Sequence, residues 1–512
     1  MSTAATSVHL GALSEESLDR NGDHESLIFE GRSWRSADLL DRARRVAGGL
    51  REIGVEPGDQ VVVMMANCPE VPVVYNAIWR MGAVVTPVVF LVTAPELRHV
   101  LVDSGAKAVV TTGDFVPKVV EAAGELDVKP HIVVAESDSA EKRDGFDVTA
   151  FDALESSEPI AVVDRDEGDL AALMYTGGTT GRSKGVELCH RNLWYCGRSA
   201  HDASYVPGLV RVLNPLPISH AFGMIVTVSG MHSPEPGVTV LMRWFDPGQW
   251  VSLAEQHRIE RGTLVPAMAQ LLLTQQLDDA DLSTLRYLNI GAAPLARETI
   301  DALEQRIPSM QVLEGYGCTE SGGVVSANPP GRRKIGSVGP PIPGYEVRIV
   351  DEDGQPVPTG TDGEVTVRAE GIMRGYRNAP EATEAALRDG WLFTGDIGRL
   401  DDDGFLTIVD RKKDLIIRNG FNVYPRDVED VLVEHPAVAM AGVVGQRHDV
   451  VGEEVVAFVS LSPGAEATED ELIAFAKTKL AGSKYPRVVH ILDQLPLTSV
   501  GKLDRKALRG RV

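Results

Sequence analysis

The sequence predicts an α/β protein: a large N-terminal domain of mostly parallel sheets with a small, barrel-like β-rich part, and a small α+β C-terminal domain. Three observations predict this fold class. Strand and helix signals alternate through the first 150 residues, short β-rich pieces follow residue 335, and a second alternating unit follows residue 413. Strands that alternate with helices form mostly parallel sheets with helices on both faces.

The N-terminal elements are read from the spacing of apolar residues. We expect Ser36 to cap a helix whose apolar residues recur at helical spacing from Leu39 to Ile53, and Gly54 to end it. The predicted strands are 27–29, 60–65, 83–85 and 108–111, and the other predicted helices are 71–81 and 95–103.

The elements predicted after residue 335 indicate where the chain divides into domains. Short strands rich in Gly, Pro and Asp are predicted within 336–350 and 363–368, and residues 401–404 predict a tight turn between two strands. The last unit is predicted to contain helices 425–434 and 469–480 and strands 438–444, 455–460 and 488–492. We therefore place an N-terminal domain at 1–410 and a C-terminal domain at 414–512, joined by 411–413.

Composition excludes some classes of partner. The 512 residues include 73 acidic and 50 basic residues, which gives a net charge of −23. Proteins that wrap nucleic acid or lie on anionic lipid need a basic face, so neither is expected as a partner. An anionic ligand stays open, because a few local donors are enough to hold it.

The cysteine pattern and the N-terminal sequence, in which we recognise no secretion signal, favour a cytoplasmic protein. The four cysteines fit neither a zinc pattern nor a disulfide framework, which is typical of free thiols in a reducing compartment. The N-terminus lacks a basic region followed by an apolar stretch, so we expect no signal peptide. The most apolar segment, 82–94, is too short for a membrane span.

The sharpest local feature is the segment 173–186, where an apolar strand leads into glycines, hydroxyls and one lysine. Glycines let the backbone turn so that successive N–H groups converge on an anion, and the hydroxyls and the lysine add donors. These residues are Thr176, Gly177, Gly178, Thr179, Thr180, Gly181 and Lys184. Gly185 follows the lysine, so the segment is not a Walker A loop. The pattern favours a loop that binds polyphosphate over a surface turn with no ligand.

This segment resembles the phosphate loop of the adenylate-forming superfamily, which includes acyl-CoA synthetases, adenylation domains and firefly-type luciferases. Its Tyr-Thr-Gly-Gly-Thr-Thr-Gly form is similar to that of some fatty acyl-CoA synthetases. Further segments resemble the family in the expected order along essentially the whole chain. The resemblance implies an N-terminal domain that binds ATP and the acyl group, and a C-terminal domain that acts as a mobile lid.

The resemblance assigns an acyl pocket and an adenine site. Segment 214–224 resembles the family segment whose histidine lines the acyl pocket. The implied pocket residues are His220, Phe222, Gly223, Gly317 and Cys318. Segment 290–295 resembles the stretch that contacts adenine, which implies roles for Gly291, Ala292 and Ala293.

Segment 314–320 is similar to the next family motif and completes the nucleotide site. It implies ATP contacts by Glu314, Gly315 and Tyr316, of which the tyrosine offers an aromatic face to adenine. Thr319 offers a hydroxyl to the α-phosphate, and Glu320 offers a hard oxygen ligand to Mg²⁺.

The C-terminal motifs supply the remaining implied roles. Asp396 and Arg411 match residues that contact the ribose, and Lys413 matches the pivot of the hinge. Gly420 matches a position beside the pantetheine arm of the thiol substrate. Lys502 matches the lysine that bridges the carboxylate and the α-phosphate.

The implied reaction uses ATP, Mg²⁺ and CoA as a co-substrate. A carboxylic acid becomes an acyl-AMP with release of pyrophosphate, and a thiol then displaces AMP. The implied catalytic residues are Lys502, Thr179, Thr319, Glu320, His220 and Lys184. Amino-acid-activating relatives carry an aspartate that holds the α-ammonium, and segment 217–224 has no acidic residue, so we expect no amino acid. Segment 321–326 is small and mostly apolar, which indicates an apolar aliphatic or aromatic acid.

The acceptor and the assembly stay open at this point. Arg243 lies where some relatives place a basic residue for a phosphate of CoA, but lysines that some relatives carry near residues 417 and 419 are missing. The alternatives are therefore transfer to a carrier-protein pantetheine or another nucleophile, and a non-catalytic nucleotide-binding regulator. The oligomeric state is expected to be a monomer or a homodimer.

Overall fold

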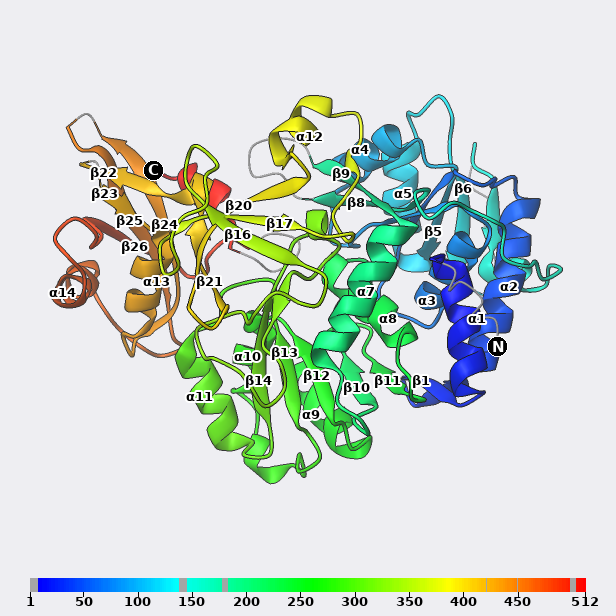
Figure 1. Cartoon of the computed structure of the whole chain (residues 1–512), viewed down its shortest axis with the longest axis horizontal. Coiled ribbons are helices and arrows are strands. Elements are labelled where there is room, and N and C mark those ends of the chain that lie inside the picture. The colour runs from blue at the N-terminus through cyan, green and yellow to red at the C-terminus, as the bar shows by residue number, and fades with distance from the viewer. Residues whose placement is uncertain (1–7, 138–144, 177–182, 420, 449, 498–502) are drawn as a thin grey trace. The chain divides into compact units, whose positions relative to one another are not determined.

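The computed structural model describes residues 8–137, 145–176, 183–419, 421–448, 450–497 and 503–512 (Figure 1). The chain divides into two compact units: unit 1 contains Met1–Val347 and Val367–Leu392, and unit 2 contains Arg348–Thr366 and Phe393–Val512. The expected pivot at 411–413 lies inside unit 2, and our placement of a domain boundary there stays a prediction.

Unit 1 contains two eight-stranded sheets within its described residues. The first has the order β18-β9-β8-β4-β3-β5-β6-β7, in which the strands from β8 through β7 pair in parallel and β9 pairs antiparallel with β8 and β18. Every residue of β3 and β5 is buried, as expected for a parallel sheet covered on both faces. The strands are β3 (Gln60–Met64), β4 (Val84–Pro87), β5 (Ala108–Thr112), β6 (His131–Ala135), β7 (Val148–Ala150), β8 (Leu170–Thr176), β9 (Lys184–Cys189) and β18 (Gly375–Tyr376).

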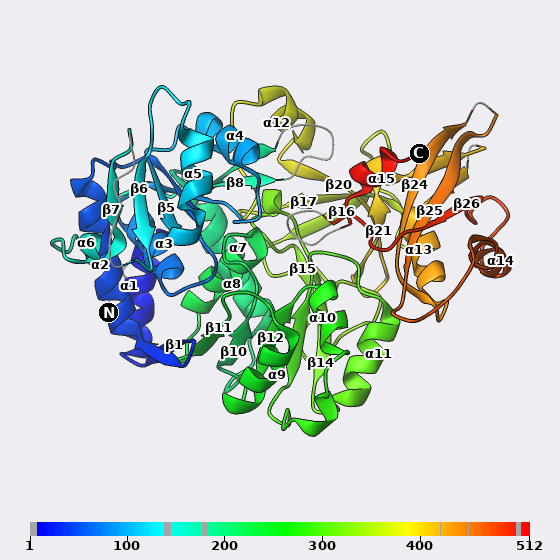
Figure 2. The same cartoon turned by 180° about the vertical axis from the view of Figure 1, so that it is seen from behind.

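The second sheet of unit 1 has the order β15-β14-β13-β12-β10-β11-β1-β2 and is parallel apart from its outermost strands. Its strands are β1 (Glu25–Phe29), β2 (Arg32–Arg35), β10 (Arg211–Asn214), β11 (Val238–Leu241), β12 (Arg261–Leu264), β13 (Tyr287–Ile290), β14 (Gln311–Tyr316) and β15 (Ser326–Ala327). Trp250 of α9 (Pro247–Gln256), Leu272 of α10 (Pro266–Leu272) and Leu303 of α11 (Arg297–Arg306) join its core (Figure 2).

The remaining helices of unit 1 each follow a strand, apart from α1, which begins the chain's element order. They are α1 (Leu10–Asn21), α2 (Ser36–Glu52), α3 (Glu70–Arg80), α4 (Ala94–Ser104), α5 (Val116–Ala123), α6 (Phe151–Glu155), α7 (His190–Ser204), α8 (Ala221–Met231) and α12 (Pro380–Ala386). None of the helices in the described ranges is both long and apolar enough to cross a membrane.

Unit 2 contains a sheet of order β23-β22-β25-β24 with β26 beside β25. Leu432 and Leu472 join one of its apolar cores, and Leu508 joins a second core with Val444 and Phe458. The elements are β22 (Ile416–Arg418), β23 (Phe421–Val423), α13 (Pro425–Val433), β24 (Val438–His448), β25 (Gly452–Leu461), α14 (Glu469–Lys479), β26 (Val488–Ile491) and α15 (Arg505–Arg509).

The β-rich part forms a smaller sheet of order β16-β17-β20-β19, with β21 beside β20. Its strands are β16 (Glu346–Val350), β17 (Gly363–Arg368), β19 (Leu387–Arg388), β20 (Trp391–Leu400) and β21 (Leu406–Arg411). The predicted turn at 401–404 joins β20 to β21, and Gly404 has a φ of +77° there. The predicted fold class is confirmed.

One local prediction is wrong. Arg35, not Ser36, is the N-cap residue of α2, and Ser36 is the first helical residue. The Ser36 hydroxyl accepts a hydrogen bond from the His24 N–H at 3.1 Å and donates to the Gly22 carbonyl at 3.3 Å. A capping hydroxyl has to face its own helix, whereas this one is taken up by the preceding turn.

Candidate active site

The candidate active site of unit 1 lies beyond the carboxyl ends of three strands of the second sheet, of which β13 and β14 are neighbours and β10 is separated from β13 by β12. β10 leads to His220, β13 leads to Gly291, and β14 leads to Gly317. Ile290 of β13 pairs with Glu314 of β14, so the segments that follow these two strands leave the sheet at a similar level. In open α/β sheets, ligands bind outside the carboxyl ends of the strands.

Small residues bring the two predicted adenine-contacting segments together. A Cβ atom added to Gly291 would lie 3.0 Å from the Gly315 carbonyl oxygen and 3.7 Å from the Phe222 ring. Ala292 follows with a φ of +73°, a left-handed conformation that strains a non-glycine residue and is common at ligand sites. The sequence-predicted residues of this stretch therefore meet one another and Phe222.

The predicted acyl-pocket residues surround the first turn of α8. His220 is the N-cap residue, and its Nδ1 accepts a hydrogen bond from the Phe222 N–H at 3.2 Å. The neutral ring therefore carries its proton on Nε2. A Cβ atom would lie 2.2 Å from the Pro217 carbonyl at Gly223, and 2.3 Å from the Gly323 carbonyl at Gly317, so both positions require glycine.

A short buried turn positions the residues after β14. The Cys318 N–H donates to the Ser321 hydroxyl at 3.2 Å, and that hydroxyl donates to the Cys318 carbonyl at 2.9 Å. The Tyr345 hydroxyl donates to the Ser321 carbonyl at 2.9 Å. These contacts close the 3₁₀ turn Thr319–Ser321, which carries the hydroxyl and the carboxylate predicted for phosphate and Mg²⁺.

A residue that the sequence did not single out lies beside this carboxylate. The Tyr376 hydroxyl donates a hydrogen bond to Glu320 Oε1 at 2.8 Å. Lys184 Nζ lies 5.0 Å from the centre of the Tyr376 ring. The predicted metal ligand and the predicted phosphate-loop lysine therefore contact the same side chain. Tyr376 is 56 residues from Glu320, so no local spacing could have revealed it.

The residues described around the phosphate loop belong to a β-hairpin. Thr176 ends β8, Lys184 begins β9, and the two residues pair directly. The remaining predicted loop residues lie outside the described part of the chain: Gly177, Gly178, Thr179, Thr180 and Gly181. Two further predicted residues, Gly420 and Lys502, also lie outside it.

Glu314, another predicted ATP contact, is buried at the end of β14. Its Oε2 accepts a hydrogen bond from the Gly336 N–H at 3.2 Å. Its backbone carbonyl accepts from the Asn328 N–H at 2.9 Å. The side chain and the backbone therefore both fix the segment that carries Tyr316.

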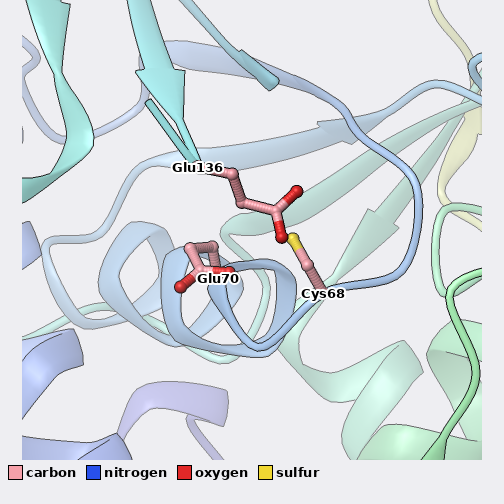
Figure 3. Close-up of side chains that lie close together, drawn as sticks. All are labelled: Cys68, Glu70 and Glu136. Carbon is pink, nitrogen blue, oxygen red and sulfur yellow. The ribbon is translucent and has the colours of Figure 1, made fainter. Parts of the chain in front are cut away.

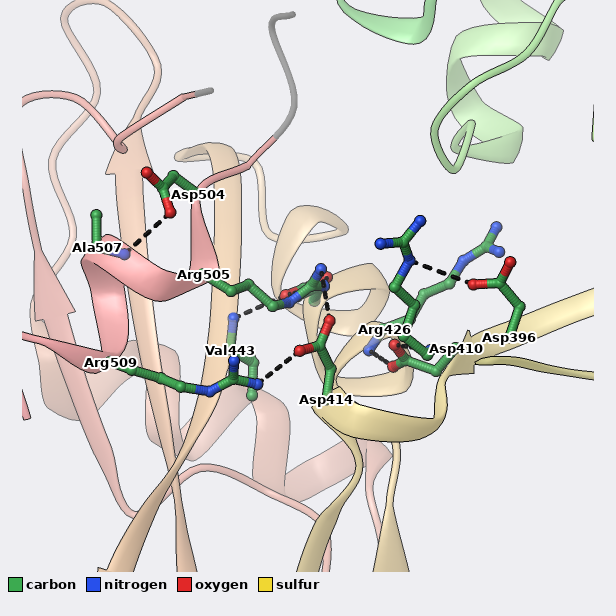
Figure 4. A network of polar contacts seen from close by, with 11 residues as sticks. Asp396, Asp410, Asp414, Arg426, Val443, Asp504, Arg505, Ala507 and Arg509 are labelled. Atoms are coloured by element: carbon green, nitrogen blue, oxygen red, sulfur yellow. Dashed lines mark hydrogen bonds and ion pairs between the residues drawn. The ribbon is translucent and has the colours of Figure 1, made fainter. Parts of the chain in front are cut away.

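The predicted ribose-binding residues of unit 2 are paired with each other. Asp396 of β20 lies opposite Arg411 of β21, and Oδ1 of the buried aspartate lies 3.2 Å from the exposed arginine's Nε (Figure 4). The next aspartate, Asp410, accepts N–H groups of Arg411 and Arg426 at 2.7 and 2.8 Å. Burial raises the pKa of Asp410, and these two N–H groups oppose that rise.

The proposed CoA contact, Arg243, belongs to a different cluster. Its guanidinium forms paired hydrogen bonds with Glu30 at 2.7 and 3.1 Å and with Glu136 at 2.6 and 2.8 Å. These hydrogen bonds raise the pKa of Arg243. A cavity of about 390 Å³ borders the cluster, lined among others by Glu30, Gly31, Met242, Arg243 and Trp244.

A group of three potential metal ligands adjoins this cluster (Figure 3). Cys68, Glu70 and Glu136 place one ligand atom each within 4.8 Å of one another. Arg42 pairs with Glu70 at 2.7 Å and Arg243 pairs with Glu136, so both carboxylates already have cations. Burial and the neighbouring carboxylates raise the pKa of the Cys68 thiol, which keeps it protonated. We assign no metal to this group.

Comparison with known proteins adds to this geometry. The family pattern of the AMP-binding enzymes matches residues 14–377, and that of the AMP-binding enzyme C-terminal domain matches residues 427–502. A long-chain-fatty-acid–CoA ligase of Bacillus subtilis is 34% identical, over 98% of this chain and 94% of that protein. A feruloyl-CoA synthase of Amycolatopsis sp is 36% identical, over 93% of each. The crystal structure of ATP-bound MatB from Rhodopseudomonas palustris has a TM-score of 0.89 and 31% identity, over 98% of both chains.

Proposed function

The chain belongs to the AMP-binding enzymes as an AMP-forming acyl-CoA synthetase, and we propose that it activates an apolar aliphatic or aromatic acid and transfers the acyl group to CoA. The acid reacts with ATP to give acyl-AMP and pyrophosphate, and the thiol of CoA then displaces AMP. The observation that carries the proposal is the placement of Glu320 and Lys184 on one tyrosine, beyond the strand ends that carry the acyl and adenine segments.

The residues of the site are suited to electrostatic catalysis. A carboxylate is a poor acyl donor because its leaving group is oxide, and its attack on ATP builds negative charge at the α-phosphate. In our proposal Thr179, Thr319 and Lys502 donate to the oxygens that gain this charge, and Lys184 binds the outer phosphates. His220 lines the acyl pocket and holds the entrance of α8 through its Nδ1.

Glu320 fits the chemistry of a Mg²⁺ ligand. Its Oε1 is held by Tyr376, and none of the described residues donates a hydrogen bond to its Oε2. Mg²⁺ in nucleotide sites is bound by one or two carboxylates together with phosphate oxygens, so a single carboxylate beside Thr319 suffices. When bound, the ion supplies positive charge that neutralises the polyphosphate.

The walls around His220 support an apolar acid. Ala221, Met224 and Ile225 of α8 are buried apolar residues, and segment 217–224 offers no carboxylate to an α-ammonium group. The relatives named above are a long-chain-fatty-acid–CoA ligase and a feruloyl-CoA synthase, one aliphatic and one aromatic in substrate. Both support an aliphatic or aromatic acid without deciding between them.

Arg243 remains our candidate for a phosphate of CoA. Its guanidinium faces a cavity of about 390 Å³, which has room for part of a nucleotide. Glu30 and Glu136 already occupy its donors, so a phosphate has to replace one carboxylate. In unit 2 we propose a pivot at Lys413, a pantetheine contact at Gly420 and ribose contacts at Asp396 and Arg411.

The assembly and the location complete the proposal. We propose a cytoplasmic enzyme that works as a monomer or a homodimer; its four free cysteines suit a reducing compartment. A carrier-protein pantetheine is the alternative acceptor, because the lysines that some relatives carry near residues 417 and 419 are missing here.

A panel of carboxylic acids tests the function. Acid-dependent exchange of labelled pyrophosphate into ATP measures the first step, and CoA-dependent release of AMP measures the second. Exchange with fatty or aromatic acids and AMP release with CoA support the proposal. If exchange occurs but AMP is released only with a pantetheinylated carrier protein, the acceptor is the carrier protein. If pyrophosphate exchange is absent with every acid, adenylate formation is contradicted.

A further inference from the structure

Tyr376 lies on a backbone segment that bridges two parts of the active site. Tyr376 pairs with Val186 of β9, and the neighbouring Arg377 N–H donates to the Gly185 carbonyl at 2.8 Å. On the other side, the Met373 N–H donates to the Glu320 carbonyl at 2.8 Å. Backbone hydrogen bonds therefore hold residues 373–377 against both the strand that follows the phosphate loop and the turn that carries Glu320.

The Tyr376 hydroxyl makes one directed contact with a carboxylate. It donates to Glu320 Oε1 at 2.8 Å, a distance typical of a strong hydrogen bond to a charged acceptor. A tyrosine hydroxyl has an ordinary pKa of about 10, so it keeps its proton at neutral pH and remains a donor. This contact fixes the carboxylate plane and leaves Oε2 to face a ligand.

The face of the same ring holds a cation. Lys184 Nζ lies 5.0 Å from the ring centre, within the range of a cation–π interaction. None of the described carboxylates forms an ion pair with Lys184, so its charge is not neutralised in this part of the structure. A long lysine side chain loses side-chain entropy when it is held, and the ring contributes to that ordering before a phosphate arrives.

We propose that Tyr376 is a positioning residue of the phosphate end of the site: its hydroxyl orients Glu320 as the divalent-metal ligand, and its ring orients Lys184 toward phosphate. The inference rests on the proposed function for the roles of Glu320 and Lys184. The inference goes beyond the proposed function because it gives one side chain, Tyr376, the task of orienting both Glu320 and Lys184. Residues that hydrogen-bond to metal ligands typically contribute about 10- to 100-fold to metal affinity or activity.

Three variants of the full chain separate the two roles. Tyr376→Phe removes the hydroxyl and keeps the ring, whereas Tyr376→Leu removes both. Ser157→Ala is the matched control, because the Ser157 hydroxyl donates at 2.9 Å to Glu52, a carboxylate that we do not assign to metal. Thermal unfolding of each variant checks that the fold is retained.

Two binding measurements without acid or CoA test the proposal. Electron paramagnetic resonance of Mn²⁺ in the presence of ATP measures metal affinity, and calorimetry of ATP with EDTA measures metal-free ATP affinity. We expect Tyr376→Phe to lower Mn²⁺ affinity about 10-fold and to retain metal-free ATP affinity. We expect Tyr376→Leu to lower both, and Ser157→Ala to keep the Mn²⁺ affinity of the unmodified enzyme.

The outcomes distinguish this inference from the proposed function. Unchanged Mn²⁺ affinity in Tyr376→Phe overturns the role of the hydroxyl, and unchanged metal-free ATP affinity in Tyr376→Leu overturns the role of the ring. An equal loss of Mn²⁺ affinity in Ser157→Ala overturns the specificity of the contact. If the unmodified chain binds Mn²⁺ and ATP but catalyses no pyrophosphate exchange, the proposed function fails while the binding test still stands.

Discussion

Arg505, labelled in Figure 4, holds both carboxylate oxygens of Glu429, with its Nη2 at 2.8 and 2.6 Å from them, in a largely buried part of unit 2. The Val443 N–H also donates to this carboxylate at 2.7 Å. On the same helix as Arg505, Arg509 donates to the buried Asp414 at 2.6 Å. The helix that follows Lys502 in the sequence is therefore tied to the residue that follows Lys413.

We predict that Glu429→Gln destabilises unit 2 by about 3 kcal/mol, because removing one partner of a buried ion pair leaves the other charge uncompensated. Burial raises the pKa of Glu429 to about 7 against the lowering effect of Arg505, so ionisation of Glu429 itself lowers the stability of the unmodified chain as the pH rises through this range, and the measurement is made above it, where the ion pair is formed. Urea unfolding at pH 8, followed by circular dichroism, measures the change. Glu434→Gln is the control: its pair with Lys479 is exposed, and we expect less than about 1 kcal/mol. Equal effects of the two variants would contradict the prediction.

We predict that Lys502→Ala reduces adenylate formation about 10²- to 10³-fold and retains thioester formation from supplied acyl-AMP, because the lysine acts on the charge of the first step alone. Pyrophosphate exchange and AMP release from the isolated adenylate measure the two steps. Lys506→Ala, a nearby exposed lysine, is expected to affect neither. Equal loss of both steps in Lys502→Ala would remove the assignment.

We predict that Lys413→Pro slows thioester formation more than adenylation. Proline restricts the backbone dihedral at the proposed pivot, which lies in the 3₁₀ turn Lys412–Asp414. Lys413→Ala removes the side chain but leaves the dihedral free, so we expect it to retain more of the second step. Single-turnover kinetics of the two steps measure the difference, and an unchanged second step in Lys413→Pro argues against a pivot here.

We predict that acid destabilises the docking of α1 through two stacked histidines. The rings of His9 and His190 lie 4.2 Å apart, and burial lowers their pKa values to about 4 and about 3. The unfolded chain binds protons at these groups from about pH 6.5 downward, whereas the folded chain does not, so stability falls as the pH falls. Each histidine is expected to contribute about 2 kcal/mol to this loss at pH 5.

His9→Asn tests this prediction, because asparagine can still cap α1 in place of the Nδ1 atom that accepts from the Ala12 N–H. Urea unfolding at pH 5 and pH 8 gives the change in stability between the two conditions. We expect this change to be about 2 kcal/mol smaller in His9→Asn than in the unmodified chain. His448→Asn, at an exposed position, is the control. The same change in all three proteins would contradict the prediction.

The sequence predicted elements well where their signals are local. The start of α14 at Glu469 agrees with the prediction, and its capping box joins Thr468 and Glu471, two residues only three positions apart. The helix predicted at 425–434 ends within one residue of α13. The assignment of Ser36 as a cap failed because the preceding turn competes for its hydroxyl, a contact that propensity does not contain.

The contrast between local signals and contacts of distant residues also applies to the candidate active site. Motif chemistry predicted a role for Lys184 and, through the family resemblance, for Glu320, because each lies in a short motif whose residue types suit phosphate or Mg²⁺. It did not find Tyr376, whose contact with Glu320 spans 56 residues. It also did not foresee that Glu30 and Glu136 occupy Arg243, since these contacts span 213 and 107 residues.

The sequence by itself therefore determined the fold class, the order of the motifs and the residue types for adenylate chemistry. These depend on periodicity and on short motifs, which act within a few residues of the chain. Only the tertiary structure decided which distant side chains meet: Tyr376 beside Glu320, and Arg505 beside Glu429. The physical reason is that sheet pairing and core packing bring together residues that are far apart in the chain, and hydrogen bonds depend on distances of about 3 Å that no local pattern specifies.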